Sequence, residues 1–520
     1  MKKTLTRAMI GALLAVSLLL AAVTPPQSYF PAISIEINDP SAGAIRINTL
    51  LDGRSSLSEC EAVTGNIARN TFKLCPQCRI VSMTCNSALT QTERGLFDET
   101  ALPFPSGRMA NGIITYESAD TNLALAACQS TQAKSRNISN PVTCYPPMTA
   151  RSRPSGPTPL SIWSLTLAIA AFASAWLTGW MIIRYEHLHA HLSHDHVGSG
   201  PQKYHETPTP RIGGITLLAG LLAAGGIMLM TEAVTTERPF GLLLLAGIPA
   251  FLGGLVEDLT KKVGVFERLL LTMLSGALGA WLLGAVLVRL DIPGIDQALQ
   301  WLPFAIILTS FAVGGIANAI NIIDGYNGLA GGFAVIVLAA LALVAYQIGD
   351  DLVFSASLAL SGALLGFLAW NWPGGKIFLG DGGAYFLGFI MAELSVLLVA
   401  RNPAVSPWFP LLLMIYPIFE TLYSIYRRKF KNNLSPGQPD NQHLHQLIHD
   451  RIIPSHAHGK HFSRNSRVAK YLWGPVGVLA IVGSVFAATT SVLIACAIGY
   501  CVFYVVNYRW LDTAIRLNRE

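Results

Sequence analysis

Long apolar stretches separated by short polar segments dominate the chain from residue 160 onward. We expect each stretch to form a membrane-spanning helix, because about 20 apolar residues in helical form cross the ~30 Å hydrocarbon core of a bilayer. Eleven such stretches begin near residues 160, 212, 239, 269, 301, 329, 353, 384, 407, 471 and 491. The last two come from one long uncharged run that must turn back near residues 489–491. The pattern predicts an all-α polytopic membrane protein with about eleven transmembrane helices over residues 160–510.

The chain opens with a basic segment followed by an apolar one. Lys2, Lys3 and Arg7 precede an apolar run over residues 8–23, which is the layout of a secretory signal. Residues 1–23 are therefore predicted to be a signal peptide or a retained signal anchor. Either one would export the polar segment that follows, residues 24–159.

The exported segment contains six of the eight cysteines of the chain: Cys60, Cys75, Cys78, Cys85, Cys128 and Cys144. An even number of cysteines in an oxidising compartment favours disulfides, here up to three, with the pairing left open. The spacing of Cys75 and Cys78 also suits a redox pair or half of a zinc site, but the segment has no histidine to complete such a site. We expect a small disulfide-rich extracytoplasmic domain over residues 24–159.

Composition and charge narrow the class of protein. Only 13% of the 520 residues are charged and the mean hydropathy is +0.46, whereas about 25% charged residues is usual for a soluble protein. The net charge of +6 is small for this length. A soluble protein and a nucleic-acid-binding protein are excluded.

The basic residues fix the orientation of the helices. If the first span runs inward, the inner loops contain 19 lysines and arginines, whereas the outer loops after residue 160 contain Arg238, Arg289 and Arg401. This asymmetry follows the positive-inside rule. The sequence therefore predicts a multi-pass membrane protein with the N-terminal domain outside the cytoplasm, in the periplasm or the extracellular space.

The predicted cytoplasmic loops also collect the residues suited to chemistry. They are Lys203, His205, Arg211, Glu257, Asp258, Asn318, Asn321, Asp324, Lys376, Asp381, Arg427, Arg428, His443 and His445. Acidic residues at a membrane face are costly unless they hold something cationic. Hard oxygen ligands suit Mg²⁺, or Mn²⁺, better than zinc, and the basic side chains can bind phosphate oxygens. The segments together predict a magnesium-dependent phosphoryl-transfer site on the cytoplasmic face.

Each segment by itself has a simpler interpretation. Glu257 and Asp258 could form local ion pairs at a solvated helix end, and Asp324 and Asp381 could be turn residues. His443 and His445 could be surface histidines in the predicted cytoplasmic loop 427–470. The convergence of all of them on one face favours a site.

The order and spacing of these motifs resemble those of the polyprenyl-phosphate N-acetylhexosamine-1-phosphate transferases, glycosyltransferase family 4. The resemblance rests on Glu257-Asp258, on Asn318-x2-Asn321-x2-Asp324-Gly325-x2-Gly328, on Gly380-Asp381-x-Gly383 and on His443-x-His445. Lys203-x-His205 with Arg211, and Glu420 with Arg427 and Arg428, match further motifs. It covers roughly residues 160–510 and leaves out the cysteine-containing domain.

The resemblance implies a reaction and its substrates. A UDP-N-acetylhexosamine would be the donor and undecaprenyl phosphate the acceptor, giving undecaprenyl-diphosphate-sugar and UMP. Departures from the family pattern are Glu257 and Asn327 where aspartate is common, and a longer acid at Glu420. His443-Leu-His445 in place of three successive histidines points to the branch that starts O-antigen, lipopolysaccharide or teichoic glycans.

The same resemblance, with the chemistry of the side chains, suggests roles for the residues. We expect Asp381 with Asp258 or Asp324 to bind the metal, and Glu257 to orient the acceptor phosphate or take its residual proton. Asn318 and Asn321 are expected on the nucleotide side, and His443, His445 and Lys203 on phosphate. His205, Arg211, Lys376, Arg427 and Arg428 are further candidates for substrate binding. The expected partners are thus the two substrates, the lipid bilayer and a second copy of the chain in a homodimer.

A divalent-metal transporter is the alternative. Five histidines crowd residues 187–196, and three more lie at residues 456–461; histidine-rich loops are typical of metal binding. A carrier should, however, place polar residues at the midplane of several helices, and here only Glu393 is so placed. The transferase interpretation is therefore preferred.

Overall fold

The computed structural model describes residues 30–39, 43–51, 58–65, 78–86, 106–109, 112–118, 124, 127, 143–145, 162–195, 208–230, 237–431, 433, 442–453 and 464–517. The chain divides into two compact units, Met1–Gly156 and Pro157–Glu520. The expected signal, residues 1–23, lies outside the described residues.

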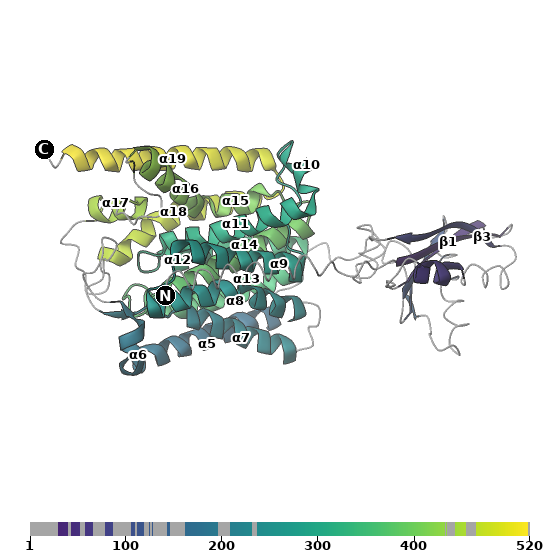
Figure 1. Cartoon of the computed structure of the whole chain (residues 1–520), viewed down its shortest axis with the longest axis horizontal. Helices are drawn as coiled ribbons and strands as arrows, with labels where there is room; N and C mark the ends of the chain where they lie inside the picture. Colours follow the sequence, from purple (N-terminus) through teal and green to yellow (C-terminus); the bar gives the residue numbers. More distant parts are fainter. Residues whose placement is uncertain are drawn as a thin grey trace. The chain divides into compact units, whose positions relative to one another are not determined.

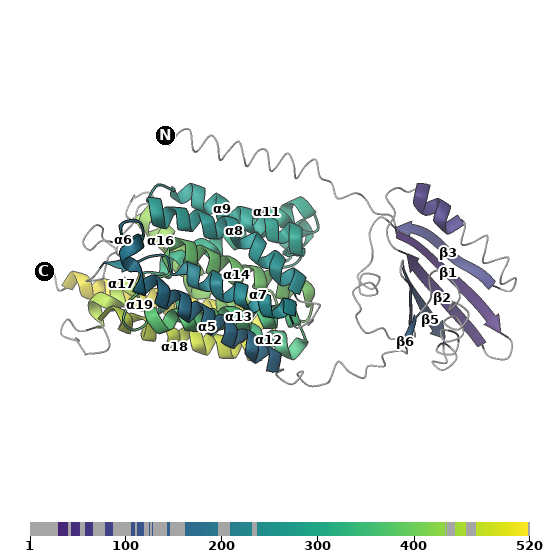
Figure 2. The same ribbon diagram turned by 90° about the horizontal axis from the view of Figure 1, so that it is seen from below.

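The first unit contains an antiparallel β-sheet that the sequence analysis did not predict (Figure 2). Its strands are β1 (Phe30–Asp39), β2 (Gly43–Leu51), β3 (Cys78–Asn86), β4 (Ser106–Met109), β5 (Gly112–Ser118) and β6 (Thr143–Tyr145), in the order β3-β1-β2-β5-β4-β6. Isoleucines alternate with polar residues at positions 33, 35 and 37 of β1, as in a strand with one buried face. The all-α prediction thus applies only to the second unit.

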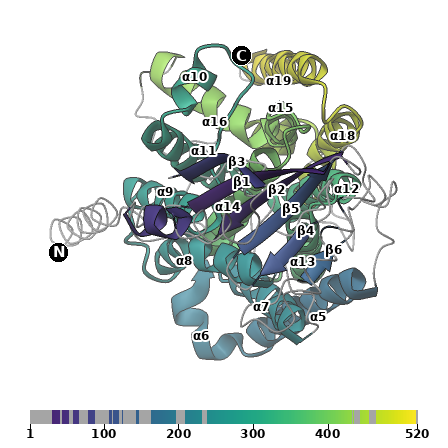
Figure 3. The same cartoon turned by 90° about the vertical axis from the view of Figure 1, so that its right-hand side faces the viewer.

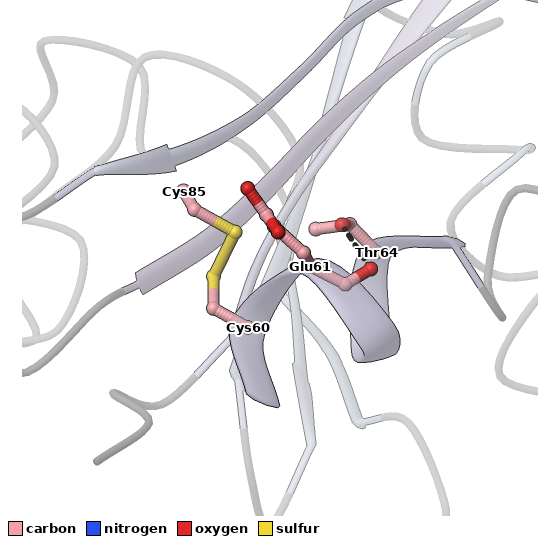
Figure 4. The surroundings of a disulfide bond; sticks show 4 residues. All are labelled: Cys60, Glu61, Thr64 and Cys85. Atoms are coloured by element: carbon pink, nitrogen blue, oxygen red, sulfur yellow. Dashed lines mark hydrogen bonds between the residues drawn. A yellow bond between two sulfur atoms is a disulfide. The ribbon is translucent and has the colours of Figure 1, made fainter. Parts of the chain in front are cut away.

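One disulfide links the sheet to a helical segment at residues 58–65. Cys60 in that segment is bonded to Cys85 in β3, and Thr64 Oγ1 donates a hydrogen bond to the Glu61 carbonyl at 3.0 Å (Figure 4). Cys75 and Cys128 lie outside the described residues, as do the side chains of Cys78 and Cys144. The disulfide framework expected for residues 24–159 is therefore seen in one pair.

The second unit is a bundle of helices. It comprises α5 (Ile162–Arg184), α6 (Glu186–Ser193), α7 (Gly214–Met230), α8 (Glu237–Thr260), α9 (Val265–Leu283), α10 (Ile295–Leu299), α11 (Leu302–Ile323), α12 (Leu329–Ile348), α13 (Asp351–Asn371), α14 (Gly380–Arg401), α15 (Trp408–Leu413), α16 (Ile415–Tyr426), α17 (Leu444–Arg451), α18 (Arg464–Val485) and α19 (Thr490–Leu517). A short strand pair, β7 (His194–Asp195) and β8 (Thr209–Pro210), follows α6. The all-α polytopic class predicted for this part of the chain is confirmed.

Within the described residues, nine helices are long and apolar enough to cross a membrane: α5, α8, α9, α11, α12, α13, α14, α18 and α19. The two other expected spans correspond to α7, which has 17 residues, and to the broken pair α15 and α16. The full count of eleven crossings stays a prediction.

Helix α14 forms the centre of the bundle. Every residue from Gly380 to Val399 is buried, and the view along the helices places α14 among its neighbours (Figure 3). It packs chiefly against α8 and α11, with α7 and α9 also in contact. The N-terminus of this central helix is where the candidate site is built.

Candidate active site

The polar ends of several helices meet at the end of the bundle that carries α6 and α17 (Figure 1). Asp258 lies near the end of α8, Arg268 near the start of α9, and Asp381 at the start of α14. Asn321 and Asp324 lie at the end of α11. The predicted convergence of separate loops on one site is therefore seen for these residues.

Glycines allow the backbones at this point to touch. A Cβ on Gly254 of α8 would lie 2.4 Å from the carbonyl of Asp381, and one on Gly380 would lie 2.0 Å from the Arg211 carbonyl oxygen. Gly380 also has a φ of +76°, which favours glycine. These two glycines thus allow Arg211, Asp258 and Asp381 to come together.

Asp258 holds the N-terminus of α14. Its carboxylate, 1% exposed, accepts hydrogen bonds from the backbone N–H groups of Asp381 at 3.0 Å and Gly382 at 2.9 Å. These N–H groups have no partner inside their own helix, and the helix dipole favours an anion there. Arg211 lies 3.6 Å from the same carboxylate. Asp258 therefore acts first as a positioning residue for Asp381.

Asp381 is the hub of the site. One carboxylate oxygen accepts hydrogen bonds from Arg211 Nη2 at 3.2 Å and Asn321 Nδ2 at 3.1 Å, and the other accepts one from Arg268 Nη1. Tyr385 donates to Asn321 Oδ1 at 3.4 Å. Donors from three separate segments thus fix the orientation of one buried carboxylate.

Asp324 lies beside this hub, and its carboxylate is available for a ligand. Among the described residues, no donor forms a hydrogen bond to that carboxylate. Although part of its side chain remains accessible, removal from water raises its pKa well above the ordinary value; Arg211 opposes this effect, while Asp381 and Asp258 add to it. A cation at this position would keep Asp324 ionised.

The donor set fits Mg²⁺ better than a metal enclosed wholly by protein. Within the described part of the chain, no three His, Cys, Asp or Glu side chains surround a common point. Mg²⁺ commonly takes one or two carboxylates and completes its coordination with water and substrate phosphates. Asp324 and Asp381 are suited to supply those carboxylates, because the donors on Asp381 are side chains that can turn toward substrate phosphate. Both oxygens of Asp258, in contrast, accept backbone N–H groups of α14.

Glu257 and Asn318 have local partners. Glu257 is half-buried and its Oε2 accepts a hydrogen bond from the Val263 N–H at 2.7 Å, which closes the turn after α8. Asn318 donates to Thr272 Oγ1 at 3.0 Å and to the Gly314 carbonyl at 2.8 Å. The helix-end interpretation of Glu257 thus has a structural basis, and Asn318 ties α11 to α9.

A second polar cluster surrounds Glu420 of α16. This carboxylate, 1% exposed, accepts hydrogen bonds from His443 Nδ1 at 2.9 Å and Tyr504 Oη at 2.8 Å. His443 Nε2 lies 3.2 Å from Arg428 Nη2. Because arginine only donates, these partners imply that Nε2 accepts and that Nδ1 carries the proton given to Glu420.

His445 connects the two clusters. Its ring stacks on His443 at a centroid separation of 5.2 Å and meets Tyr326 edge-on at 5.5 Å. A Cβ on Gly325 would lie 3.7 Å from His445 Nε2. The His443-x-His445 motif therefore lies against the turn that carries Asp324, as a shared site requires.

The remaining basic candidates differ in their surroundings. Arg427 and Arg428 are buried in a π-helical turn, Arg427–Lys431, and Arg427 Nη1 donates to Tyr508 Oη at 2.5 Å. Lys376 is exposed, with Nζ 5.5 Å from the centre of the Trp370 ring. Lys203 and His205 lie outside the described residues, so their roles stay predictions.

Three residues of the site were not singled out from the sequence. Arg268 and Tyr385 both contact the Asp381 cluster but belong to apolar helices, and Tyr504 lies in the final apolar run. The only sequence signal for Arg268 is a lone arginine at the start of a predicted span. Aromatic hydroxyls in apolar helices carry no distinguishing pattern.

Comparisons with known proteins agree with this geometry. Residues 240–399 match the profile described as glycosyl transferase family 4, a range that includes Asp258, Arg268, Asn321, Asp324 and Asp381. The chain is 30% identical over 256 residues to the probable undecaprenyl-phosphate N-acetylglucosaminyl 1-phosphate transferase of Bacillus subtilis, covering 48% of this chain and 67% of that protein.

Two further relatives carry similar names. The decaprenyl-phosphate N-acetylglucosaminephosphotransferase of Mycobacterium leprae is 29% identical over 357 residues, or 62% of this chain and 82% of the relative. The undecaprenyl-phosphate alpha-N-acetylglucosaminyl 1-phosphate transferase of Escherichia coli is 28% identical over 268 residues, or 48% of this chain and 67% of the relative.

Proposed function

Since the chain belongs to the family of polyprenyl-phosphate N-acetylglucosamine-1-phosphate transferases, we propose that it transfers N-acetylhexosamine 1-phosphate from a UDP-sugar to undecaprenyl phosphate. The products are undecaprenyl-diphosphate-sugar and UMP. The observation that carries the proposal is the Asp381 hub, in which Arg211, Arg268 and Asn321 converge on one carboxylate beside Asp324.

The reaction is an exchange of phosphate bonds. An oxygen of the acceptor phosphate forms a bond to the sugar-bearing phosphorus, and the bond from that phosphorus to the bridging oxygen of UMP breaks. A phosphate monoester with a second pKa near ~6 is already largely ionised at neutral pH. A strong general base is therefore unnecessary, and the main tasks of the protein are positioning and charge neutralisation.

The residues of the hub divide these tasks. Asp324 and Asp381 are proposed to hold Mg²⁺, which when bound neutralises charge on the diphosphate. The guanidinium groups of Arg211 and Arg268 can turn from Asp381 toward the diphosphate oxygens of the substrate. Glu257, which interacts electrostatically with Arg268, is proposed to orient the acceptor phosphate.

The Glu420 cluster is proposed to help bind the acceptor, undecaprenyl phosphate. Glu420 fixes His443, which stacks on His445, so both imidazoles are held next to the Asp324 turn. We propose that His445 contacts a phosphate group of the substrates and that His443, whose ring nitrogens already meet Glu420 and Arg428, positions His445. An apolar pocket of about 450 Å³ between α15, α16 and α19 includes Phe419 and Val505 in its lining, each next in sequence to a member of this cluster. We assign it to the polyprenyl chain.

The biological setting follows from the same proposal. We propose that the site lies on the cytoplasmic face of a bacterial inner membrane, which the basic residues of the inner loops support, and that the product starts a surface polysaccharide such as O-antigen. The relatives do not favour the metal-transporter alternative. That alternative rested on the histidine-rich segments, and Glu393 was its only acid near the midplane of the membrane. The carboxylate oxygens of Glu393 lack hydrogen-bond partners among the described residues.

The test is a transfer assay with the full-length protein in membranes. Membranes are incubated with undecaprenyl phosphate, Mg²⁺ and a panel of UDP-N-acetylhexosamines, and the lipid product is identified by mass. We expect release of UMP with one donor and loss of transfer when EDTA removes the metal. Absence of any lipid-linked sugar phosphate with every donor would overturn the proposal.

Matched variants assign the result to the hub. Asp381→Asn and Asp324→Asn should each lower the rate by ~10²-fold or more, as is typical of removing a positioned charge. Asp296→Asn removes an acid from α10, at the opposite end of the bundle, and should leave the rate unchanged (Figure 1). Equal rates in all three variants would show that the hub is not the active site.

A further inference from the structure

Helix α6 has a feature that the transfer reaction does not use. It extends the chain beyond α5 and contains His187, His189 and His191 within eight residues. These side chains lie outside the Asp381 hub and the Glu420 cluster. Their surroundings differ from one histidine to the next.

His189 is committed to the structure of the protein. Its Nδ1 lies 2.6 Å from Ser193 Oγ and its Nε2 lies 3.0 Å from the Ile182 carbonyl oxygen. Both ring nitrogens are therefore engaged. This histidine ties α6 to the end of α5 and is unsuited to binding a metal.

His187 and His191 are both exposed. They are four residues apart in a continuous helix, so they lie on the same face with Cβ atoms about 5–6 Å apart. The same spacing places the two zinc-binding histidines of helical His-x3-His motifs. Imidazole nitrogen is a preferred ligand of zinc, copper and nickel, whereas Mg²⁺ prefers oxygen.

We infer that His187 and His191 form a binding site for a divalent transition-metal ion, separate from the proposed magnesium site. Two imidazoles would supply the protein ligands, and water would complete the coordination. This fits the finding that no three metal-binding side chains surround a common point in the described part of the chain. The site needs no rearrangement of the backbone, because the helix already sets the spacing.

The position of α6 links this site to the active site. The carbonyl of Ser193, the last residue of α6, accepts a hydrogen bond from the Arg211 N–H at 2.9 Å. Immediately after α6, His194 in β7 pairs with Pro210 in β8. A metal that clamps the last turns of α6 would therefore also steady the backbone that presents Arg211 to Asp381. This link to transfer rests on the proposed function, whereas metal binding does not.

The binding test uses the full-length protein in detergent micelles, without a polyhistidine tag. Zn²⁺ affinity is measured by calorimetry, and Cu²⁺ is added as a spectroscopic probe. We expect electron paramagnetic resonance to report two imidazole nitrogens on the copper. H187A/H191A should lower the affinity by about tenfold or more and remove the two-nitrogen signal.

The control keeps the number of removed histidines comparable. H456A/H458A/H461A removes three histidines from a different segment and should keep both the affinity and the signal. If this triple variant loses binding while H187A/H191A keeps it, the assignment to α6 is wrong. Equal binding by the wild-type protein and both variants also overturns it.

The link to Arg211 is tested by transfer at saturating Mg²⁺ with and without micromolar Zn²⁺. We expect the wild-type rate to change by about fivefold, while H187A/H191A keeps its rate. An identical response of the two proteins would place the effect of zinc elsewhere and overturn the link. A protein that binds zinc but transfers no sugar would contradict the proposed function and leave the α6 site standing.

Discussion

Asp258 and Asp381 have the same side chain but different roles in the site, because their hydrogen-bond partners differ. Both oxygens of the Asp258 carboxylate accept backbone N–H groups of α14, whereas Asp381 accepts side-chain donors from Arg211, Arg268 and Asn321. The sequence could predict that these acids meet, because they flank apolar stretches on one predicted face. It could not separate their roles, since those depend on donors from distant helices.

Glu257 offers a test at the level of one charge. Glu257→Gln keeps an oxygen that can accept from Val263 N–H but removes the charge near Arg268. If the charge orients the acceptor, kcat should fall by ~10²-fold, and Glu257→Asp, which keeps the charge, should lose far less. Turnover is measured at saturating substrates. Near-normal turnover of Glu257→Gln would show that this residue only closes the end of α8.

At the level of elements, hydrophobic length predicted where helices lie better than how they end. Each expected apolar stretch contains a helix, but α15 and α16 are separate and a π-helical turn follows α16 at Arg427–Lys431. Such a turn is frequent at functional sites, and it carries Arg427 and Arg428. A local widening of the helix depends on buried partners such as Tyr508, which hydropathy does not reveal.

The contact between α8 and α14 can be tested with two glycines of the same helix. Gly254→Ala would place a methyl group 2.4 Å from the Asp381 carbonyl and from the Gly382 nitrogen. Because these atoms belong to the backbone, the helices must separate. We expect a loss of about 1–3 kcal/mol in stability and a large loss of transfer. Thermal unfolding in micelles and the transfer assay provide the measurements.

Gly241→Ala is the matched control for that variant. It lies in the same helix, and a Cβ there meets no atom within 4 Å. Its stability should stay within ~0.5 kcal/mol of the wild-type protein. If the two alanine variants behaved alike, the close approach of α8 and α14 would not matter for the site.

The loop that carries His443 depends on an acid from another helix. Glu420→Gln leaves a buried amide group facing the donors of His443 and Tyr504, at a cost of about 1–3 kcal/mol. We expect faster hydrogen exchange in residues 442–453 and slower transfer. Tyr504→Phe removes one donor and should be milder. Unchanged exchange in Glu420→Gln would mean that other contacts hold the loop.

At the level of the whole molecule, the sequence predicted the membrane unit and missed the sheet of the first unit. Membrane helices are recognised from long local apolar runs, whereas β1 also pairs with β3 and β2 pairs with β5, strands that are distant from each other in the sequence. Short alternating strands give a weaker signal than twenty apolar residues. The cysteine content predicted disulfide bonds in residues 24–159 but did not predict the fold of this segment.

Because the chain divides into two compact units, we expect the second unit to catalyse transfer without the first. A protein that starts at Pro157, behind a replacement signal anchor that keeps α5 in its orientation, should retain transfer within about twofold, because all site residues described above lie in the second unit. Product formation per mole of inserted protein is the measurement. A truncated protein that inserts normally but makes no lipid product would assign the first unit a part in catalysis.

The buried position of α14 has a consequence for how the protein is made. The helices that pack most against it, α7, α8, α9, α11, α12 and α13, all precede it in the chain. When the ribosome releases α14, the helices that surround it have therefore already been synthesised. This order matters for Glu393, whose buried carboxylate would be costly in bare lipid. This central helix can therefore pass from the translocon directly to neighbours that have already been inserted.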